Sequence, residues 1–195
     1  QVLTQTLLAA GADVCALDLV ASRRRKAAEL GVPLVAGEPG DDAAGIVRDW
    51  SGGVGADTVF LCTAGGAGLV ELACGLARDR GRIVIVGTPP IDVPRDPFFA
   101  RELTLTIARA YGPGRYDPTY EEEGVDYPIG YVRWTQERNR IEFLRLLDRG
   151  LVRVEPLISH RFDLADAPAA YRLLGQAPES AIGVLLTYES ENGSV

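Results

Sequence analysis

Hydrophobic residues along this chain follow two alternating patterns, a helical spacing and short continuous runs. Residues 1–11 show the helical spacing, so we predict a helix that ends at Gly11. Its apolar stripe consists of Leu3, Leu7, Leu8 and Ala10. The apolar run of residues 14–17 follows as a predicted strand, and it ends on an acidic residue, Asp18.

The same alternation continues through the first half of the chain. Two further helices are predicted over residues 21–30 and 41–50, and a third follows the glycine-rich residues 65–68 and ends at Arg80. Further strands are predicted over residues 33–36, 58–62 and 82–87. The last two strands are apolar throughout, which is typical of strands buried on both faces of a sheet.

Acidic and hydroxyl side chains stand where these helices should begin. Ser22 or Asp18 is expected to cap the helix over residues 21–30. Asp41 and Asp42 suit the positive amino end of the next helix.

Strands that alternate with helices predict the fold class. We expect an α/β fold, a Rossmann-type doubly wound parallel sheet in three layers (α/β/α), truncated before its first strand and glycine loop. Such folds bind ligands outside the carboxyl ends of their strands. Here those ends are Asp18, residues 63–65 and residues 87–89, and we expect them to line one crevice. The missing strand should leave a gap between the strand that ends at Asp18 and the strand over residues 58–62.

The pattern changes after residue 90. Residues 103–108 alternate with period two, which predicts an edge strand that could pair with a second subunit. Residues 111–138 hold most of the tyrosines together with glycines and prolines, and we expect a long ordered loop with a functional role. Helices are predicted over residues 141–149 and 167–174, a strand over 182–187, and a frayed polar tail over 189–195.

Composition excludes several classes of partner. The 195 residues carry 27 acidic against 20 basic side chains, a net charge of −7, so nucleic acid and anionic membrane surfaces would be repelled on average. No apolar run approaches the roughly 20 residues that a membrane-spanning helix needs. The chain begins with Gln and contains no Met, so we expect a piece of a longer protein.

Cysteine and acidic clusters give no metal site. The three cysteines are far apart in apolar runs, so we expect buried, reduced thiols and a cytoplasmic protein; they are Cys15, Cys62 and Cys74. The acidic triplet of residues 121–123 lacks companion His or Cys residues and is expected to be solvated.

Four motifs in order give this chain a family resemblance. They are GADTVFLCTAG (55–65), GRIVIVG (81–87), PLISHRFDLADAPAAYRLL (156–174) and IGVLLTY (182–188). The chain resembles the zinc-type alcohol dehydrogenases, the medium-chain dehydrogenase/reductase family, over nearly its whole length. The loop of residues 111–139 is more specific and is similar to the medium-chain half of two-domain oxidoreductases that continue into a Gfo/Idh/MocA-like module.

This resemblance implies a domain plan and a reaction. Residues 1–151 would be an NAD(P)-binding domain, and residues 152–195 would return to a GroES-like catalytic domain that this chain lacks. The implied reaction is hydride transfer between a nicotinamide and a small alcohol or carbonyl substrate, possible substrates including sugar-related ones. Zinc would be held only by the missing domain, and a piece without that domain is expected to be inactive alone. A homodimer through residues 103–108 is also implied.

Asp18 is the first candidate cofactor residue. A carboxylate at this strand end accepts hydrogen bonds from the ribose hydroxyls of NAD and repels the phosphate of NADP, so NAD is favoured. Arg23, within the run of residues 23–25, could flank the adenosine. The alternatives are an ordinary helix-capping aspartate and a solvated helix face.

Two later strand ends supply the other candidates. The resemblance places the backbone of Thr63, Ala64 and Gly65 beside the cofactor, and Gly87 and Thr88 at its nicotinamide end. Tight strand-to-helix turns are the alternative explanation for both. No catalytic residue is identified, because His160, the only histidine, lies in a stretch that is structural in the family.

Two other functions use the same pattern. An S-adenosylmethionine-dependent methyltransferase also has an acid after its second strand, although the motifs at residues 156–174 and 182–188 favour the dehydrogenase. A non-catalytic module could use the tyrosine-rich loop and the edge strand for assembly within a larger polypeptide.

Overall fold

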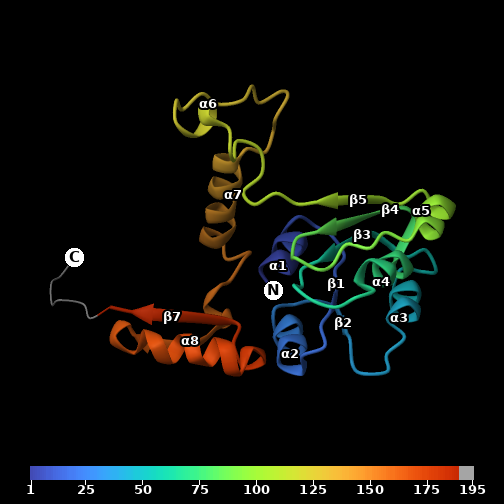
Figure 1. Ribbon diagram of the computed structural model, residues 1–195, viewed down its shortest axis with the longest axis horizontal. Coiled ribbons are helices and arrows are strands. Elements are labelled where there is room, and N and C mark those ends of the chain that lie inside the picture. Colours follow the sequence, from blue (N-terminus) through green and yellow to red (C-terminus); the bar gives the residue numbers. More distant parts are fainter. Residues whose placement is uncertain (189–195) are drawn as a thin grey trace. The chain divides into compact units, whose positions relative to one another are not determined.

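The computed structural model describes residues 1–188, which group into two compact units. One unit combines residues 1–39 with residues 145–188, and the other is the continuous stretch of residues 40–144 (Figure 1). The polar tail predicted for residues 189–195 lies outside the described residues.

The amino-terminal part of the first unit is a strand–helix–strand arrangement preceded by a helix. Its elements are α1 (Val2–Ala9), β1 (Cys15–Leu17), α2 (Ala21–Glu29) and β2 (Leu34–Ala36). The two strands pair in parallel, with Ala16 opposite Val35. The buried core of this part is Val14, Ala27 and Val32, against which Leu7 and Leu8 pack. The predicted helices and strands of this region are therefore confirmed.

Two local expectations in this region were wrong. Ala10 is exposed, and the buried residue of α1 is Gln5. Gln5 is only 3 % exposed because its side-chain amide is hydrogen bonded to the backbone of Arg153. Neither Ser22 nor Asp18 caps α2: its N-cap residue is Val20, which makes no side-chain cap.

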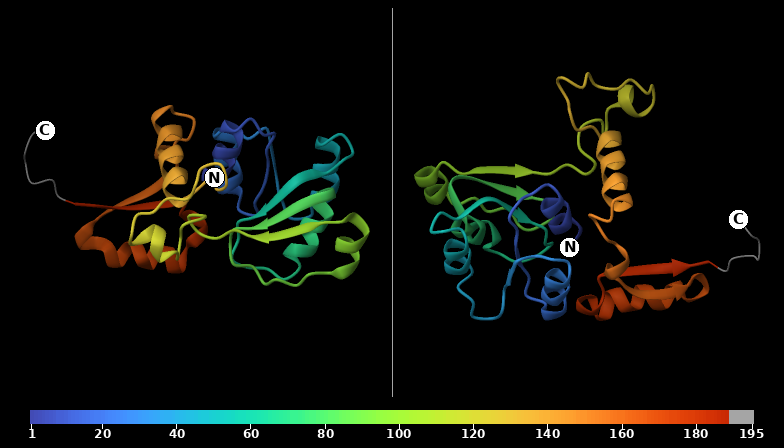
Figure 2. Two further views of the ribbon diagram at one scale, coloured as in Figure 1. Left: turned by 90° about the horizontal axis from the view of Figure 1, so that it is seen from above. Right: turned by 180° about the vertical axis from the view of Figure 1, so that it is seen from behind.

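The carboxyl-terminal part of the first unit forms a second strand–helix–strand arrangement. Its elements are η1 (Glu155–Leu157), β6 (Ile158–Asp163), η2 (Leu164–Asp166), α8 (Ala167–Gln176), η3 (Pro178–Ser180) and β7 (Gly183–Thr187). Strands β6 and β7 are parallel, and α8 lies alongside them (Figure 2). The sequence predicted α8 and β7 but not β6, whose half-buried positions alternate with exposed polar ones.

The second unit holds a three-stranded parallel sheet in the order β3–β4–β5 (Figure 1). Its elements are α3 (Ala43–Trp50), β3 (Ala56–Leu61), α4 (Leu69–Leu76), β4 (Ala77–Ile85), α5 (Arg95–Arg101), β5 (Thr104–Ile107), α6 (Pro118–Glu121) and the first part of α7 (Gln136–Asp148). Ile83 on the central strand is fully buried, and Val59 lies opposite it on β3. Helix α4 packs against both strands.

Several bounds in this unit differ from the predicted ones. Helix α4 ends at Leu76 instead of Arg80, because Ala77 already pairs with Ala56 as the first residue of β4. The long loop expected over residues 111–138 contains the short helix α6, and α7 begins at Gln136. Asp42 caps α3 as its position suggested, accepting a hydrogen bond from the Gly45 N–H at 3.0 Å.

The architecture as a whole is an α/β fold of the Rossmann type. All of the paired strands among the described residues run parallel, and helices flank them. Strands β1 and β3 belong to different sheets, and the expected gap between them stays a prediction. Within residues 1–188, no helix has the length and apolar character needed to cross a membrane.

Candidate cofactor site

Asp18 directly follows β1 and is held by the turn after β2. Its N–H donates to the carbonyl oxygen of Ala36 at 3.1 Å, and its Oδ1 accepts the N–H of Val20 at 2.8 Å. Gly37 has a φ of +113°, and a β-carbon there would lie 2.6 Å from the carbonyl oxygen of Asp18. Only glycine allows this close approach, so the loop after β2 fixes the backbone of Asp18.

Arg24 ties the same two strand ends together. Its Nη1 donates to the carbonyl oxygens of Asp18 and Leu19, both at 2.9 Å, and to that of Gly37 at 3.2 Å. Its Nη2 forms an ion pair with Glu38 at 3.3 Å, and its side chain is 13 % exposed. Arg24 therefore holds the turn that presents the Asp18 carboxylate.

The other two arginines of this run have different surroundings. Arg23 donates from Nη2 to the carbonyl oxygen of Pro178 at 3.1 Å, and its own carbonyl accepts the Gln1 side-chain amide at 2.9 Å. Arg25 is exposed. The sequence pointed to Arg23 as the residue that flanks the adenosine and not to Arg24, because three successive arginines give no signal as to which one turns inward.

The second set of candidate residues lies at the carboxyl ends of β3 and β4. The N–H groups of Val86 and Gly87 both donate to the carbonyl oxygen of Leu61 at 2.9 Å, and that of Thr88 donates to Thr63 at 3.1 Å. A β-carbon at Gly87 would lie 2.1 Å from the carbonyl oxygen of Thr63. The structure therefore brings Thr63, Gly87 and Thr88 together within the second unit.

The packing explains some of these glycines without a ligand. Gly87 is required by the contact between the two loops themselves, so the tight-turn interpretation of this residue is sufficient. Gly65 differs, because a β-carbon there would meet nothing within 4 Å. Thr63, Ala64 and Gly65 are all exposed. That these loops and Asp18 line one crevice stays a prediction.

The thiols and carboxylates form no metal site in the described part of the chain. No group of three His, Cys, Asp or Glu side chains could hold a metal ion there. All three cysteines are free, but Cys62 is exposed, so the expectation of three buried thiols was wrong. Burial raises the pKa of the Cys15 thiol to about 11, which keeps it protonated at neutral pH.

His160 contacts its neighbours Ser159 and Phe162 on the same strand. It lies on β6, with Nδ1 3.0 Å from Oγ of Ser159 and its ring stacked against Phe162 at a centroid distance of 6.3 Å. In the acidic triplet, Glu121 pairs with Arg115 at 2.8 Å. The hydrogen bond from Arg115 lowers the pKa of Glu121.

Parallel strands with flanking helices form the kind of α/β fold in which ligands bind outside the carboxyl ends of the strands. The chain belongs to the zinc-binding dehydrogenase family, whose sequence model matches residues 1–125. A search of the curated proteins found no match.

Solved structures of dehydrogenases share the fold. An alcohol dehydrogenase from Thermus sp. ATN1 aligns with a TM-score of 0.71 and 24 % identity, covering 95 % of this chain and 48 % of the other. A short chain alcohol dehydrogenase from E. coli complexed with NADH aligns with a TM-score of 0.66 and 21 % identity, covering 94 % and 48 %. A mycobacterial protein complexed with NADPH aligns with a TM-score of 0.68 and 22 % identity, covering 94 % and 53 %. The chain thus spans about half the length of these proteins.

Proposed function

We propose that this chain is the nucleotide-binding part of an NAD(P)-dependent oxidoreductase that transfers hydride between a nicotinamide and an alcohol or carbonyl substrate. Membership of the zinc-binding dehydrogenase family supports the reaction class. The observation that carries the proposal is the Asp18 carboxylate after β1, on a backbone that is held by Arg24 and Gly37.

The position and chemistry of Asp18 suit a ribose. Its Oδ1 accepts the N–H of Val20, which orients the carboxylate, and Oδ2 would accept from a ribose hydroxyl. A charged acceptor forms a stronger hydrogen bond than a neutral one, and a carboxylate can serve two neighbouring hydroxyls. Because its backbone is fixed on both sides, little conformational freedom would be lost on binding.

The surroundings of Asp18 favour NAD over NADP. A carboxylate at this point repels a phosphate on the 2′ oxygen of the ribose. The guanidinium of Arg24 is already bonded to three carbonyl oxygens and that of Arg23 to Pro178, so neither is presented to a phosphate. Structures of the same fold hold NADH in one case and NADPH in another.

The loops after β3 and β4 are proposed to receive the nicotinamide end. Thr63, Ala64, Gly65 and Thr88 are all exposed. When bound, the nicotinamide would supply the hydride-accepting carbon, while this chain would orient it. Residues that polarise the substrate oxygen, and any zinc, would come from outside this chain.

Four further expectations stay predictions. The exposed edge strand β5 would pair with a second copy in a homodimer, because it forms its ladder with β4 alone in the described sheet. The division at residues 151 and 152, and a following Gfo/Idh/MocA-like module, also stay predictions. So does a cytoplasmic setting.

Calorimetry on the full-length protein tests the cofactor proposal. NAD should bind more tightly than NADP, and Asp18→Asn should weaken NAD binding about tenfold or more, because a hydrogen bond to a charged group is lost. Asp13→Asn, an exposed aspartate on the loop before β1, is the matched control and should bind NAD as the parent does. Unchanged NAD affinity in Asp18→Asn, or binding of S-adenosylmethionine in place of NAD, would contradict the proposal.

A further inference from the structure

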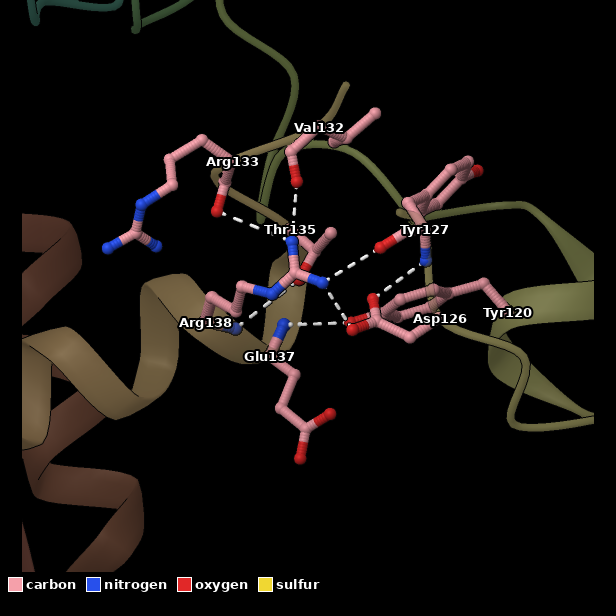
Figure 3. Close-up of polar contacts among 8 residues, drawn as sticks. All are labelled: Tyr120, Asp126, Tyr127, Val132, Arg133, Thr135, Glu137 and Arg138. Atoms are coloured by element: carbon pink, nitrogen blue, oxygen red, sulfur yellow. Dashed lines mark hydrogen bonds and ion pairs between the residues drawn. The ribbon is translucent and has the colours of Figure 1, made fainter. Parts of the chain in front are cut away.

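Residues 109–138 form an ordered framework between β5 and α7, built around Arg138 (Figure 3). The Nη1 of Arg138 donates to the carbonyl oxygens of Val132 and Arg133, and its Nη2 donates to the Asp126 carboxylate and to the carbonyl oxygen of Tyr127. The Arg138 side chain is 17 % exposed. The guanidinium thus joins residues 126–127 and residues 132–133 to α7, the helix that carries it.

Tyrosines provide a second set of cross-links. The Tyr127 hydroxyl donates to the Asp117 carboxylate, and the Tyr120 ring stacks on that of Tyr127 with centroids 5.5 Å apart. The N–H of Glu137 donates to the Tyr120 hydroxyl at 3.2 Å (Figure 3). A segment with this many internal bonds has a defined shape that can be complementary to a ligand.

The framework borders an open surface pocket of about 500 Å³, which we call the Arg109 pocket. Two arginines, two tyrosines, an aspartate and the turn of residues 112–114 line it: Arg109, Arg115, Tyr116, Tyr127 and Asp117. This volume is within the range that small-molecule sites occupy.

Most charges in the Arg109 pocket are already paired. Arg115 forms an ion pair with Glu121 at 2.8 Å. The Asp117 carboxylate accepts the Tyr127 hydroxyl and, at 3.1 Å, the N–H of Thr119. Within residues 1–188, no carboxylate lies within ion-pair distance of Arg109. Its Nη1 donates to the carbonyl oxygen of Arg115 at 3.2 Å, and its guanidinium lies 5.5 Å from the centroid of the Tyr116 ring.

The turn that forms the wall of the pocket is strained. Tyr111 and Tyr116 both have a φ of +66°, a region that side chains other than glycine rarely occupy. A β-carbon at Gly114 would lie 2.7 Å from the ring of Tyr120, so the turn is pressed against the framework. Strained non-glycine residues that the surrounding structure holds in place cluster at ligand sites.

The segment leaves the sheet at the edge where α/β folds bind ligands. The N–H of Ala108 donates to the carbonyl oxygen of Ile85 at 2.8 Å, so the chain reaches Arg109 directly from the carboxyl end of β5. Strand β4, the neighbour of β5, leads at the same edge into Gly87 and Thr88. The Arg109 pocket and the proposed nicotinamide loops thus follow adjacent strands of one sheet.

We propose that the Arg109 pocket binds an anionic oxygen group, a carboxylate or a phosphate monoester, of a small molecule. The exposed Arg109 guanidinium would donate two parallel hydrogen bonds to such a group, beside the Tyr116 ring. Because the pocket follows the strand next to the proposed nicotinamide loop, the anionic group belongs to the substrate of the oxidoreductase. That last assignment rests on the proposed function.

Calorimetry with three probes tests the pocket on the full-length protein. Succinate and inorganic phosphate represent the two anionic groups, and succinamide is the neutral control. We expect at least one anion, and not succinamide, to bind. Arg109→Gln should weaken that binding about tenfold to a hundredfold, because a charge-assisted bidentate contact is lost. Arg109→Lys should recover part of the anion affinity, because lysine keeps the positive charge but cannot donate the two parallel hydrogen bonds of a guanidinium.

Arg133→Gln is the matched control. Arg133 also lies over an aromatic ring, that of Trp134 at 4.3 Å, but it does not line the pocket, so its substitution should leave anion binding unchanged. Absence of binding by both anions, or equal binding by the parent and Arg109→Gln, would overturn the inference. NAD titrations of the same variants separate the two proposals: Arg109→Gln should bind NAD normally, and Asp18→Asn should bind the anion normally.

Discussion

A β-carbon added to Gly87 would lie 2.1 Å from the carbonyl oxygen of Thr63. The loops that follow β3 and β4 therefore touch backbone to backbone, and no side chain fits between them. We expect Gly87→Ala to lower the free energy of unfolding by about 1 to 3 kcal/mol, because the overlap forces the two loops apart. Urea denaturation measures this change.

Gly65→Ala is the control for that measurement. A β-carbon at Gly65 meets nothing within 4 Å, and its φ lies in the ordinary range. This substitution should leave the unfolding free energy within about 0.5 kcal/mol of the parent value. Equal effects of the two substitutions would contradict the packing explanation of Gly87.

Arg24→Leu should loosen the turn that carries Asp18. Three carbonyl oxygens lose a donor, and we expect a loss of about 1 to 3 kcal/mol in unfolding free energy. Arg25→Leu, the same replacement at the neighbouring exposed position, should have little effect. Chemical denaturation of the two variants side by side decides whether the inward arginine has been identified correctly.

Gln5→Leu should destabilise the first unit although it places an apolar residue in a buried position. The Gln5 amide donates to the carbonyl oxygen of Arg153 at 3.1 Å and accepts its N–H at 2.8 Å. Leucine leaves both backbone groups without a partner, at a cost of about 1 to 3 kcal/mol. Thermal unfolding checks this, with Thr6→Val as the control, because the half-buried Thr6 loses only a hydrogen bond to the Val2 carbonyl oxygen within the same helix. A melting temperature equal to that of the parent would contradict it.

Tyr127 should ionise late in an alkaline titration. Its hydroxyl donates to the Asp117 carboxylate, which raises its pKa above the ordinary 10.0. Since the folded-state pKa is above the unfolded one, the stabilising bond is fully present below pH 10.0 and is lost as the pH rises through the folded pKa. Ultraviolet absorbance of tyrosinate records this step, which Tyr127→Phe should remove and Asp117→Asn should shift to lower pH.

The three thiols should react with a disulfide reagent in the order of their exposure. Cys62 is exposed, Cys15 is half-buried with a pKa of about 11, and Cys74 is buried. We expect one fast-reacting thiol at mildly alkaline pH, and Cys62→Ser should abolish the fast phase. A fast phase that persists in Cys62→Ser would show that another cysteine is accessible.

Much of the fold follows from patterns that extend over a few residues. The apolar runs that end at Leu61 and Ile85 are buried strands because unbroken apolar sequence is stable only between two covered faces. Asp42 caps α3 because a short acidic side chain reaches the free N–H groups of the first turn. The placement of Asp18 after β1 follows from the same local reasoning.

The remainder depends on contacts that local sequence does not specify. Gln5 is buried because its side-chain amide is hydrogen bonded to the backbone of Arg153. That partner lies 148 residues away, and nothing near Gln5 in the sequence indicates it. Arg24 turns inward because two strand ends present three carbonyl oxygens at one point. Strand β6 was missed although its positions alternate between half-buried and exposed, because the polar His160 occupies one of the half-buried positions and leaves only Ile158 and Phe162 apolar. Such features depend on the tertiary structure, to which local propensity is only a weak guide.

The bond between Gln5 and Arg153 also has a kinetic consequence. The unit that it helps to hold is assembled from residues 1–39 and 145–188, whereas the other unit is one uninterrupted stretch. Closing so long a loop costs entropy before any contact is gained, and folding slows as contacting residues become more distant along the chain. During synthesis, residues 40–144 can fold before the chain is complete. The unit that contains α1, β1 and β2 can be completed only after residues 145–188 have been made.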